Sequence, residues 1–263
     1  MTRKVIAIMS RRLKNLGLVS ICAVQLIVVA SMTLRAQDAV QSTLVKASEL
    51  LSLGKGTEAI AELDVAVGKQ PNNVSLLQLR AETLFRVGEF EKSVKDFDKV
   101  VELRPQLKAE NWQRGIALYY VGRFKDGADQ FEEHHRVNPD DVENTFWFFL
   151  CLAKAESIEA ARKKIIPSRG DARPPLMEIY KLVRGEVTPA DVEKSIRQFT
   201  AGTSGREQAE FYGYLYLGLW FDLQGDKPKA IDYLKKSLAA NDRGYMADVG
   251  KVHLKTLQSS PSK

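Results

Sequence analysis

Apolar residues recur along this chain with a period of 34 residues. A large apolar residue stands at Leu63, Phe97 and Phe131, each 34 positions after the one before. A leucine slot and a small-residue slot keep the same spacing. They hold Leu50, Leu84 and Leu118, and Ala47, Ala81 and Gly115. Because independent slots share one period, the pattern predicts three copies of one structural unit, over residues 40–73, 74–107 and 108–141.

Glycine and proline punctuate each copy at the same spacing. Gly54, Gly88 and Gly122 stand 34 residues apart, and so do Pro71, Pro105 and Pro139. The glycine permits a sharp turn between two helices, and the proline ends the second helix. Each copy is therefore predicted to be an antiparallel helix hairpin in which the small residue allows close approach and the large residue fills the space. One hairpin cannot bury its apolar face alone, so the copies must stack.

This period and these residue types resemble the tetratricopeptide repeat (TPR). The third copy carries the most family positions, including Trp112, Gly115 and Phe124. The resemblance implies an all-α fold: a right-handed superhelix of antiparallel helix hairpins, or TPR solenoid. It covers residues 40–141 and returns at 211–244, where the positions that match are Leu217, Gly218, Phe221, Gly225, Ala230 and Leu234.

The remaining chain divides around these repeats. Residues 142–205 are predicted to be a degenerate helical linker module, because Pro167 and Pro174-Pro175 interrupt the expected partner helix. Residues 206–258 are predicted to hold the fourth TPR-like hairpin and a C-terminal capping helix, and residues 259–263 a tail.

Residues 1–36 have the build of an export signal. They hold basic residues and no acidic ones, followed by an apolar run over residues 16–34 and a possible cleavage position at Ala36. The run is also long enough to span a bilayer, so a signal peptide and an N-terminal membrane anchor are both open. Either predicts an exported chain, in the periplasm or cell envelope, that is secreted or anchored through residues 16–34.

The net charge of +6 is confined to this segment. Six of the 39 basic residues lie in residues 1–36, which leaves 33 basic against 33 acidic residues in the rest of the chain. The chain beyond the segment is therefore neutral, and no nucleic-acid partner is expected.

No catalytic or metal-binding motif stands out. Glu132, Glu133 and His134 lack the spacing of a zinc protease, and the glycines are repeat punctuation and not a phosphate-binding loop. Cys151, within an apolar stretch, is predicted to be a buried and inert thiol. We expect no enzyme activity, no cofactor and no metal. The alternative is a metal-dependent hydrolase that uses these three side chains.

A partner-binding groove is the more specific prediction. In TPR arrays the first helix of each hairpin lines the concave face, and aromatic side chains there suit peptide anchoring. For Trp112, Tyr119 and Phe146, a place in the core between repeats is an equal alternative. The eight predicted groove residues are Gln78, Glu82, Arg86, Trp112, Ile116, Tyr119, Tyr120 and Phe146.

Residues 211–218 and 235–241, with the capping helix, resemble the bacterial new-lipoprotein-I family. This resemblance implies an envelope adaptor that brings a protease or murein hydrolases to their targets, often as a homodimer. The predicted function is therefore a non-enzymatic adaptor of the periplasm or cell envelope that binds proteins or peptide segments. A membrane-anchored structural subunit of an envelope or secretion complex is the alternative.

Overall fold

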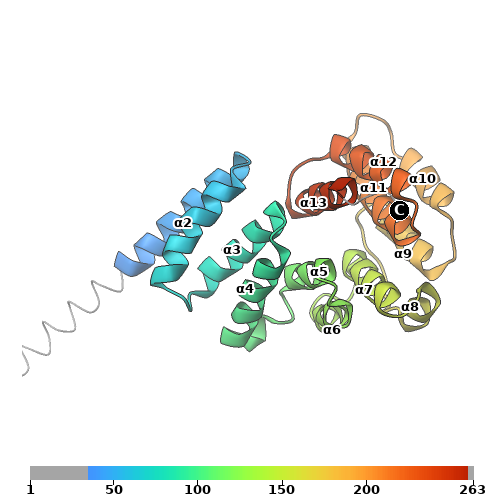
Figure 1. Ribbon diagram of the computed structural model, residues 1–263. Coiled ribbons are helices and arrows are strands. Elements are labelled where there is room, and N and C mark those ends of the chain that lie inside the picture. The colour runs from blue at the N-terminus through green and yellow to red at the C-terminus, as the bar shows by residue number, and fades with distance from the viewer. Residues whose placement is uncertain (1–34, 260–263) are drawn as a thin grey trace, which may run out of the picture. The chain divides into compact units, whose positions relative to one another are not determined.

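The computed structural model describes residues 35–259, and within that range the chain is helical without strands (Figure 1). The predicted signal or anchor segment lies outside the described residues, except for residues 35 and 36. So does most of the predicted tail. No helix among the described residues has the length and apolar character needed to cross a membrane. The chain divides at residue 66 into two compact units.

The described part of the first unit consists of one helix and most of a second, which form a hairpin. Residues 35–52 are helical, and α2 (Gly56–Lys69) follows and continues into the second unit. Gly54 makes the turn between them with a φ of +73°. Ala47, Ala59 and Leu63 are fully buried. The predicted small and large slots of the first copy are therefore core positions.

The second unit runs from Val67 to the C-terminus and consists of helices joined by short connections. The predicted all-α fold built from helix hairpins is confirmed. In chain order the elements are α3 (Val74–Val87), α4 (Phe90–Leu103), the short 3₁₀ helix η1 (Pro105–Leu107), α5 (Trp112–Tyr120), α6 (Phe124–His135), α7 (Val142–Ala155), α8 (Ile158–Lys164), α9 (Leu176–Arg184), α10 (Pro189–Arg197), α11 (Ser204–Leu223), α12 (Lys227–Ala240) and α13 (Tyr245–Ser259).

The hairpins are as tight as the small slots predict. A Cβ atom added to Gly115 on α5 would lie 2.7 Å from Cζ of Phe131 on α6. The equivalent atom on Gly218 of α11 would lie 2.8 Å from Cγ of Leu234 on α12. Both distances are far shorter than ordinary carbon contacts. The same small-against-large contact therefore holds together the third hairpin and the distant fourth copy.

The irregular middle is built from shorter helices. α8 stops before Pro167, and the chain then runs without regular structure to α9. Thr188 caps α10 by a reciprocal pair of hydrogen bonds with Asp191, and Pro189 occupies the first turn. α9 and α10 pack against each other and against α11.

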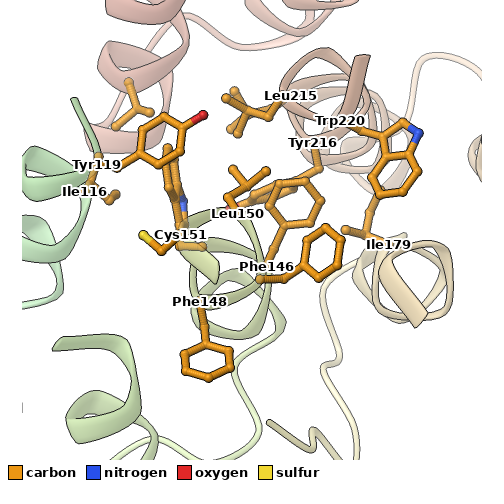
Figure 2. Packing of buried hydrophobic residues seen from close by; sticks show 14 of the residues in the cluster. Ile116, Tyr119, Phe146, Phe148, Leu150, Cys151, Ile179, Leu215, Tyr216 and Trp220 are labelled. Carbon is orange, nitrogen blue, oxygen red and sulfur yellow. The ribbon is translucent and has the colours of Figure 1, made fainter. Parts of the chain in front are cut away.

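Helix α7 is the centre of the core of the second unit. Its residues from Asn144 to Leu152 are all buried, because α5, α6, α8, α9 and α11 surround it. Phe146 meets the ring of Tyr216 on α11 at a centroid distance of 4.7 Å (Figure 2). Phe149 stacks on Trp220. Cys151 is also fully buried, as predicted, and burial raises the pKa of its thiol.

The Gly115 contact generates a stability prediction. Gly115→Ala should lower the free energy of unfolding by about 1–3 kcal/mol, because the new methyl group overlaps a buried and rigid phenyl ring. Gly68→Ala is the matched control. Gly68 is exposed in α2 with no atom near its added Cβ, so alanine should raise stability by up to about 1 kcal/mol through helix propensity. Urea unfolding of both variants measures this, and equal effects would contradict the close-contact explanation.

Candidate partner-binding site

The eight predicted groove residues divide into a buried set and a partly exposed set. Ile116 and Phe146 are 0% exposed and Tyr119 is 8% exposed. All three belong to the hydrophobic core. The reason is that α7 packs against α5, and α11 packs against α7. The partly exposed set, which still offers surface, comprises Gln78, Glu82, Arg86, Trp112 and Tyr120.

The C-terminal helix α13 covers part of this set. Arg86 Nε donates to Asp248 Oδ2 at 2.8 Å, and its guanidinium lies 5.0 Å from the ring centroid of Tyr245. Tyr245 also stacks on Phe85 and meets Trp112 edge-on at 5.1 Å. The predicted capping helix thus lies between α12 and α3 (Figure 1), and its side chains also contact α5.

A row of three polar side chains secures the same contact further along α13. The hydroxyl of Tyr120 lies 3.0 Å from Nδ1 of His253, and Nε2 of His253 lies 3.3 Å from Asp222 Oδ2 on α11. Burial raises the pKa of Tyr120 well above its usual value, so its hydroxyl stays neutral. Tyr120 is thus held by the protein itself.

The polar members of the partly exposed set are also engaged within the chain. Gln78 donates to Glu82 at 2.9 Å and accepts from Asn111, the N-cap of α5, at 3.0 Å. These bonds tie α3 to the start of α5. Trp112 is the groove residue that remains half-exposed beside an open cavity.

That cavity, called the pocket below, has a volume of about 200 Å³ and lies between α5, α6 and α7. Its apolar walls are Trp112, Ile116, Phe131, Trp147 and, from α13, Met246. Its polar wall and rim are His134, Asn138, Asp141, Glu143, Asn144 and Arg173. The pocket therefore combines predicted groove residues with side chains that the groove prediction did not contain.

Arg173 is the centre of an ionic cluster at the rim. Its guanidinium donates to Asp171 at 2.6 Å and to Asp141 at 2.7 Å, and it also donates to Glu143. We call these four residues the Arg173 cluster. Asp141 is at the same time the N-cap of α7, since it accepts from the backbone N–H of Glu143. The irregular segment after α8 is thereby tied to the first turn of α7.

The carboxylates around Arg173 differ in their protonation. Burial raises the pKa of Glu143 to about 7, and this outweighs the Arg173 charge and the hydrogen bond from Tyr216. Burial also acts on Asp171, but hydrogen bonds from Arg173 hold the pKa of Asp171 below its usual value. Glu143 is therefore the carboxyl of the cluster whose charge changes near neutral pH.

Two buried polar atoms of the pocket residues lack a hydrogen-bond partner in the protein. They are Oδ1 of Asn144 and Nε1 of Trp147. Both side chains are at most 3% exposed, and Nδ2 of Asn144 donates to the Phe131 carbonyl at 3.1 Å. Buried polar groups are rarely left unpaired in folded proteins. An unpaired acceptor and donor beside a cavity are therefore typical of a binding site.

The residues of the alternative hydrolase reading are not assembled into a metal site. His134 is buried, and its Nδ1 lies 2.8 Å from the Ala109 carbonyl, whereas Glu132 is exposed. Across residues 35–259 there is no group of three or more His, Cys, Asp or Glu side chains placed to hold a metal ion. His134 instead forms part of the pocket wall.

Sequence reasoning missed the Arg173 cluster and the position of α13. Arg173 lies in the proline-rich stretch that broke the repeat pattern, and Asp141 lies 32 residues away. Asp248 lies 162 residues from Arg86. The sequence carries no periodic signal for either pair.

Solved structures share this fold. A tetratricopeptide repeat protein from Parabacteroides merdae aligns with a TM-score of 0.52 and 19% identity, over 82% of this chain and 83% of that one. MamA from Desulfovibrio magneticus RS-1 aligns at 0.47 and 17% identity, over 85% and 98% of the two chains. TTC0263, a TPR protein of Thermus thermophilus, aligns with a TM-score of 0.46 and 14% identity, over 83% of this chain and 98% of that one. No protein-family model and no curated protein matches the chain. The likeness to the Parabacteroides merdae protein establishes the TPR type of fold.

The raised pKa of Glu143 predicts a pH dependence of stability. The folded state holds this proton more tightly than the unfolded state, whose carboxyl has a pKa of about 4.5, so the stabilisation is complete below that value and is lost as the pH rises through about 7. The free energy of unfolding should therefore fall by about 2 kcal/mol more between about pH 5 and about pH 8 in the native chain than in Glu143→Gln. Urea titrations at both pH values measure the difference, and equal slopes would contradict the assignment.

Proposed function

We propose that this chain is a non-enzymatic scaffold that binds a partner protein at the pocket beside Trp112. The observation that supports this most directly is the pocket itself, where a half-exposed tryptophan, apolar walls and a charged rim meet on the predicted groove side of a TPR-type fold. Aromatic anchors beside a few polar groups are typical of sites that hold a side chain of a partner.

The pocket is favoured over the wider groove as the site of contact. Arg86 and Tyr120 already bind α13, and Gln78 and Glu82 bind each other. A partner that used these residues would first have to displace bonds within the chain, whereas the pocket is open at Asn138 and Trp112.

The proposal has an envelope setting. The basic start and the apolar run of residues 16–34 support export to the periplasm or cell envelope, either by a cleaved signal or with an anchor. The resemblance of residues 211–241 to new-lipoprotein-I adaptors suggests an envelope protease or murein hydrolase as partner and a homodimer as a possible assembly. If the apolar run is retained, the chain is an anchored subunit of an envelope complex.

Site-specific photocrosslinking tests the contact site. A benzoylphenylalanine at Asn138, an exposed residue of the pocket rim, should form adducts with partner proteins in native cells. The same group at Phe199, an exposed aromatic residue that does not line the pocket, is the near-isosteric control and should give no shared adduct. Adding Trp112→Ala should reduce the Asn138 adduct by about tenfold, because loss of an aromatic anchor costs about 1.4 kcal/mol or more.

Two outcomes would refute the proposed site. One is the same set of adducts from Asn138 and from Phe199. The other is an Asn138 adduct whose yield is unchanged by Trp112→Ala, in a variant that circular dichroism shows to be helical.

Export has its own test. Residues 1–36 fused to a reporter enzyme that is active only outside the cytoplasm should give activity, and N-terminal sequencing of the full chain should then distinguish cleavage near Ala36 from a retained anchor. An inactive fusion would contradict the envelope setting and leave the pocket proposal intact.

A further inference from the structure

The pocket carries more negative than positive charge. Asp141, Glu143 and Asp171 share the single guanidinium of Arg173. Asp141 and Glu143 line the pocket together with Arg173. One cation among three carboxyl groups leaves an excess of one negative charge when Glu143 is protonated and of two when it is ionised. The rim therefore favours a positively charged visitor over a negatively charged one.

Four of the five N–H groups of Arg173 donate within the cluster. Its Nε donates to Asp171, its Nη1 to Glu143 and its Nη2 to both Asp141 and Asp171. The guanidinium also lies 5.5 Å from the ring centroid of Tyr212. An anionic ligand that approached Arg173 would meet the carboxylates that accept these bonds.

The inner wall adds acceptors. Oδ1 of Asn144 has no hydrogen-bond partner in the protein. Nδ1 of His134 donates to the Ala109 carbonyl, because a carbonyl can only accept, so in the neutral ring Nε2 is an acceptor. This Nε2 atom lies 4.0 Å from Asp141 Oδ2. The inner wall thus carries two acceptors, Oδ1 of Asn144 and Nε2 of His134, and one donor, Nε1 of Trp147. The two unpaired atoms among them, Oδ1 and Nε1, are buried.

The apolar walls suit the same ligand. Trp112 and Trp147 line the pocket, and Phe131 stacks on Trp147 at a centroid distance of 6.4 Å. Indole rings attract cations through their negative faces, and their area also covers the aliphatic stem of a long side chain. Acidic rim, inner acceptors and aromatic walls therefore point to one ligand chemistry.

We propose that the pocket receives a lysine or arginine side chain of the partner protein, with its charged end toward Asp141 and Asn144 and its stem against Trp112. This inference rests on the proposed function and specifies the chemistry that the partner presents. The cation binds to the carboxylate excess at Asp141, and the tryptophan supplies the apolar contact.

Short peptides that differ at one position test this chemistry. Four blocked pentapeptides, with arginine, lysine, citrulline or glutamate between flanking glycine and alanine residues, are titrated into the full chain labelled with 5-fluorotryptophan. The chain has three tryptophans, of which Trp112 and Trp147 line the pocket and Trp220 does not, so Trp220 is an internal reference. Fluorine resonances report binding even at millimolar affinity.

The arginine and lysine peptides should shift the Trp112 and Trp147 resonances and leave Trp220 unchanged. Citrulline keeps the shape of arginine without its charge, so the citrulline peptide should bind about tenfold more weakly. Asp141→Asn retains an N-cap side chain but loses the charge, and should weaken the arginine peptide by a similar factor. Asp140→Asn is the matched control, since Asp140 is the preceding residue, pairs with Arg169 and does not line the pocket.

A second pair of variants changes exposed residues outside the Arg173 cluster, although the side chain of Asn138 also donates to Asp141 Oδ2 at 3.2 Å. Asn138→Lys places a cation at the exposed pocket rim and should reduce binding of the arginine peptide at least about fivefold, whereas Val137→Lys, at an exposed neighbour that does not line the pocket, should not.

Equal binding of the citrulline and arginine peptides, preference for glutamate, or the absence of any tryptophan shift would each overturn the cation proposal. The Asn138 crosslink then distinguishes a failure of the ligand chemistry from a failure of the proposed scaffold function. If Trp112-dependent adducts form while the charge of the peptide has no effect, the scaffold function stands and only the ligand chemistry is wrong. If neither is seen, both fail.

Discussion

The arrangement of the second unit depends on the burial of α7 on every side. Phe146 and Phe149 of this helix pack against Tyr216 and Trp220 of α11, while Trp147 stacks against Phe131 of α6. One helix thus joins the regular hairpins to the fourth copy, although the chain between them is irregular. Each aromatic ring buried here contributes several kcal/mol when compared with alanine, so the position of α11 follows from the sequence of α7.

The same helix also builds the candidate site. Its N-cap residue Asp141 and its first-turn residue Glu143 hold Arg173, and its next residues Asn144 and Trp147 line the pocket. Apolar residues fix the helix, and the polar residues at its N-terminal end then have little freedom to move. An unpaired amide and indole are tolerated here because the surrounding packing is strong enough to offset their cost of about 1–3 kcal/mol each.

The path of α13 explains why the binding surface is a pocket and not a long groove. Tyr245 contacts Phe85 and Trp112, and His253 bonds Tyr120. Helix α13 therefore covers part of the surface of α3 and α5, the first helices of their hairpins, that was predicted to face a partner. Aromatic residues that bind a partner and aromatic residues that pack against another helix of the same chain show the same pattern in the sequence. Of the residues predicted for the groove, Ile116 and Phe146 lie in the core, whereas Trp112 is partly exposed. Partner binding at this surface stays a prediction.

The sequence by itself determined the hairpins, because their signals are local and repeated: a small residue, a large residue and a turn glycine recur every 34 positions, and Gly115 against Phe131 realises this geometry. It also determined the distant fourth copy, where Gly218 and Leu234 meet in the same way. Only the tertiary structure decided the pairing of Arg173 with Asp141, the pairing of Asp248 with Arg86, and the pocket beside Trp112. Such contacts join positions 32 to 162 residues apart and depend on how the helices stack, for which a periodic pattern holds no information.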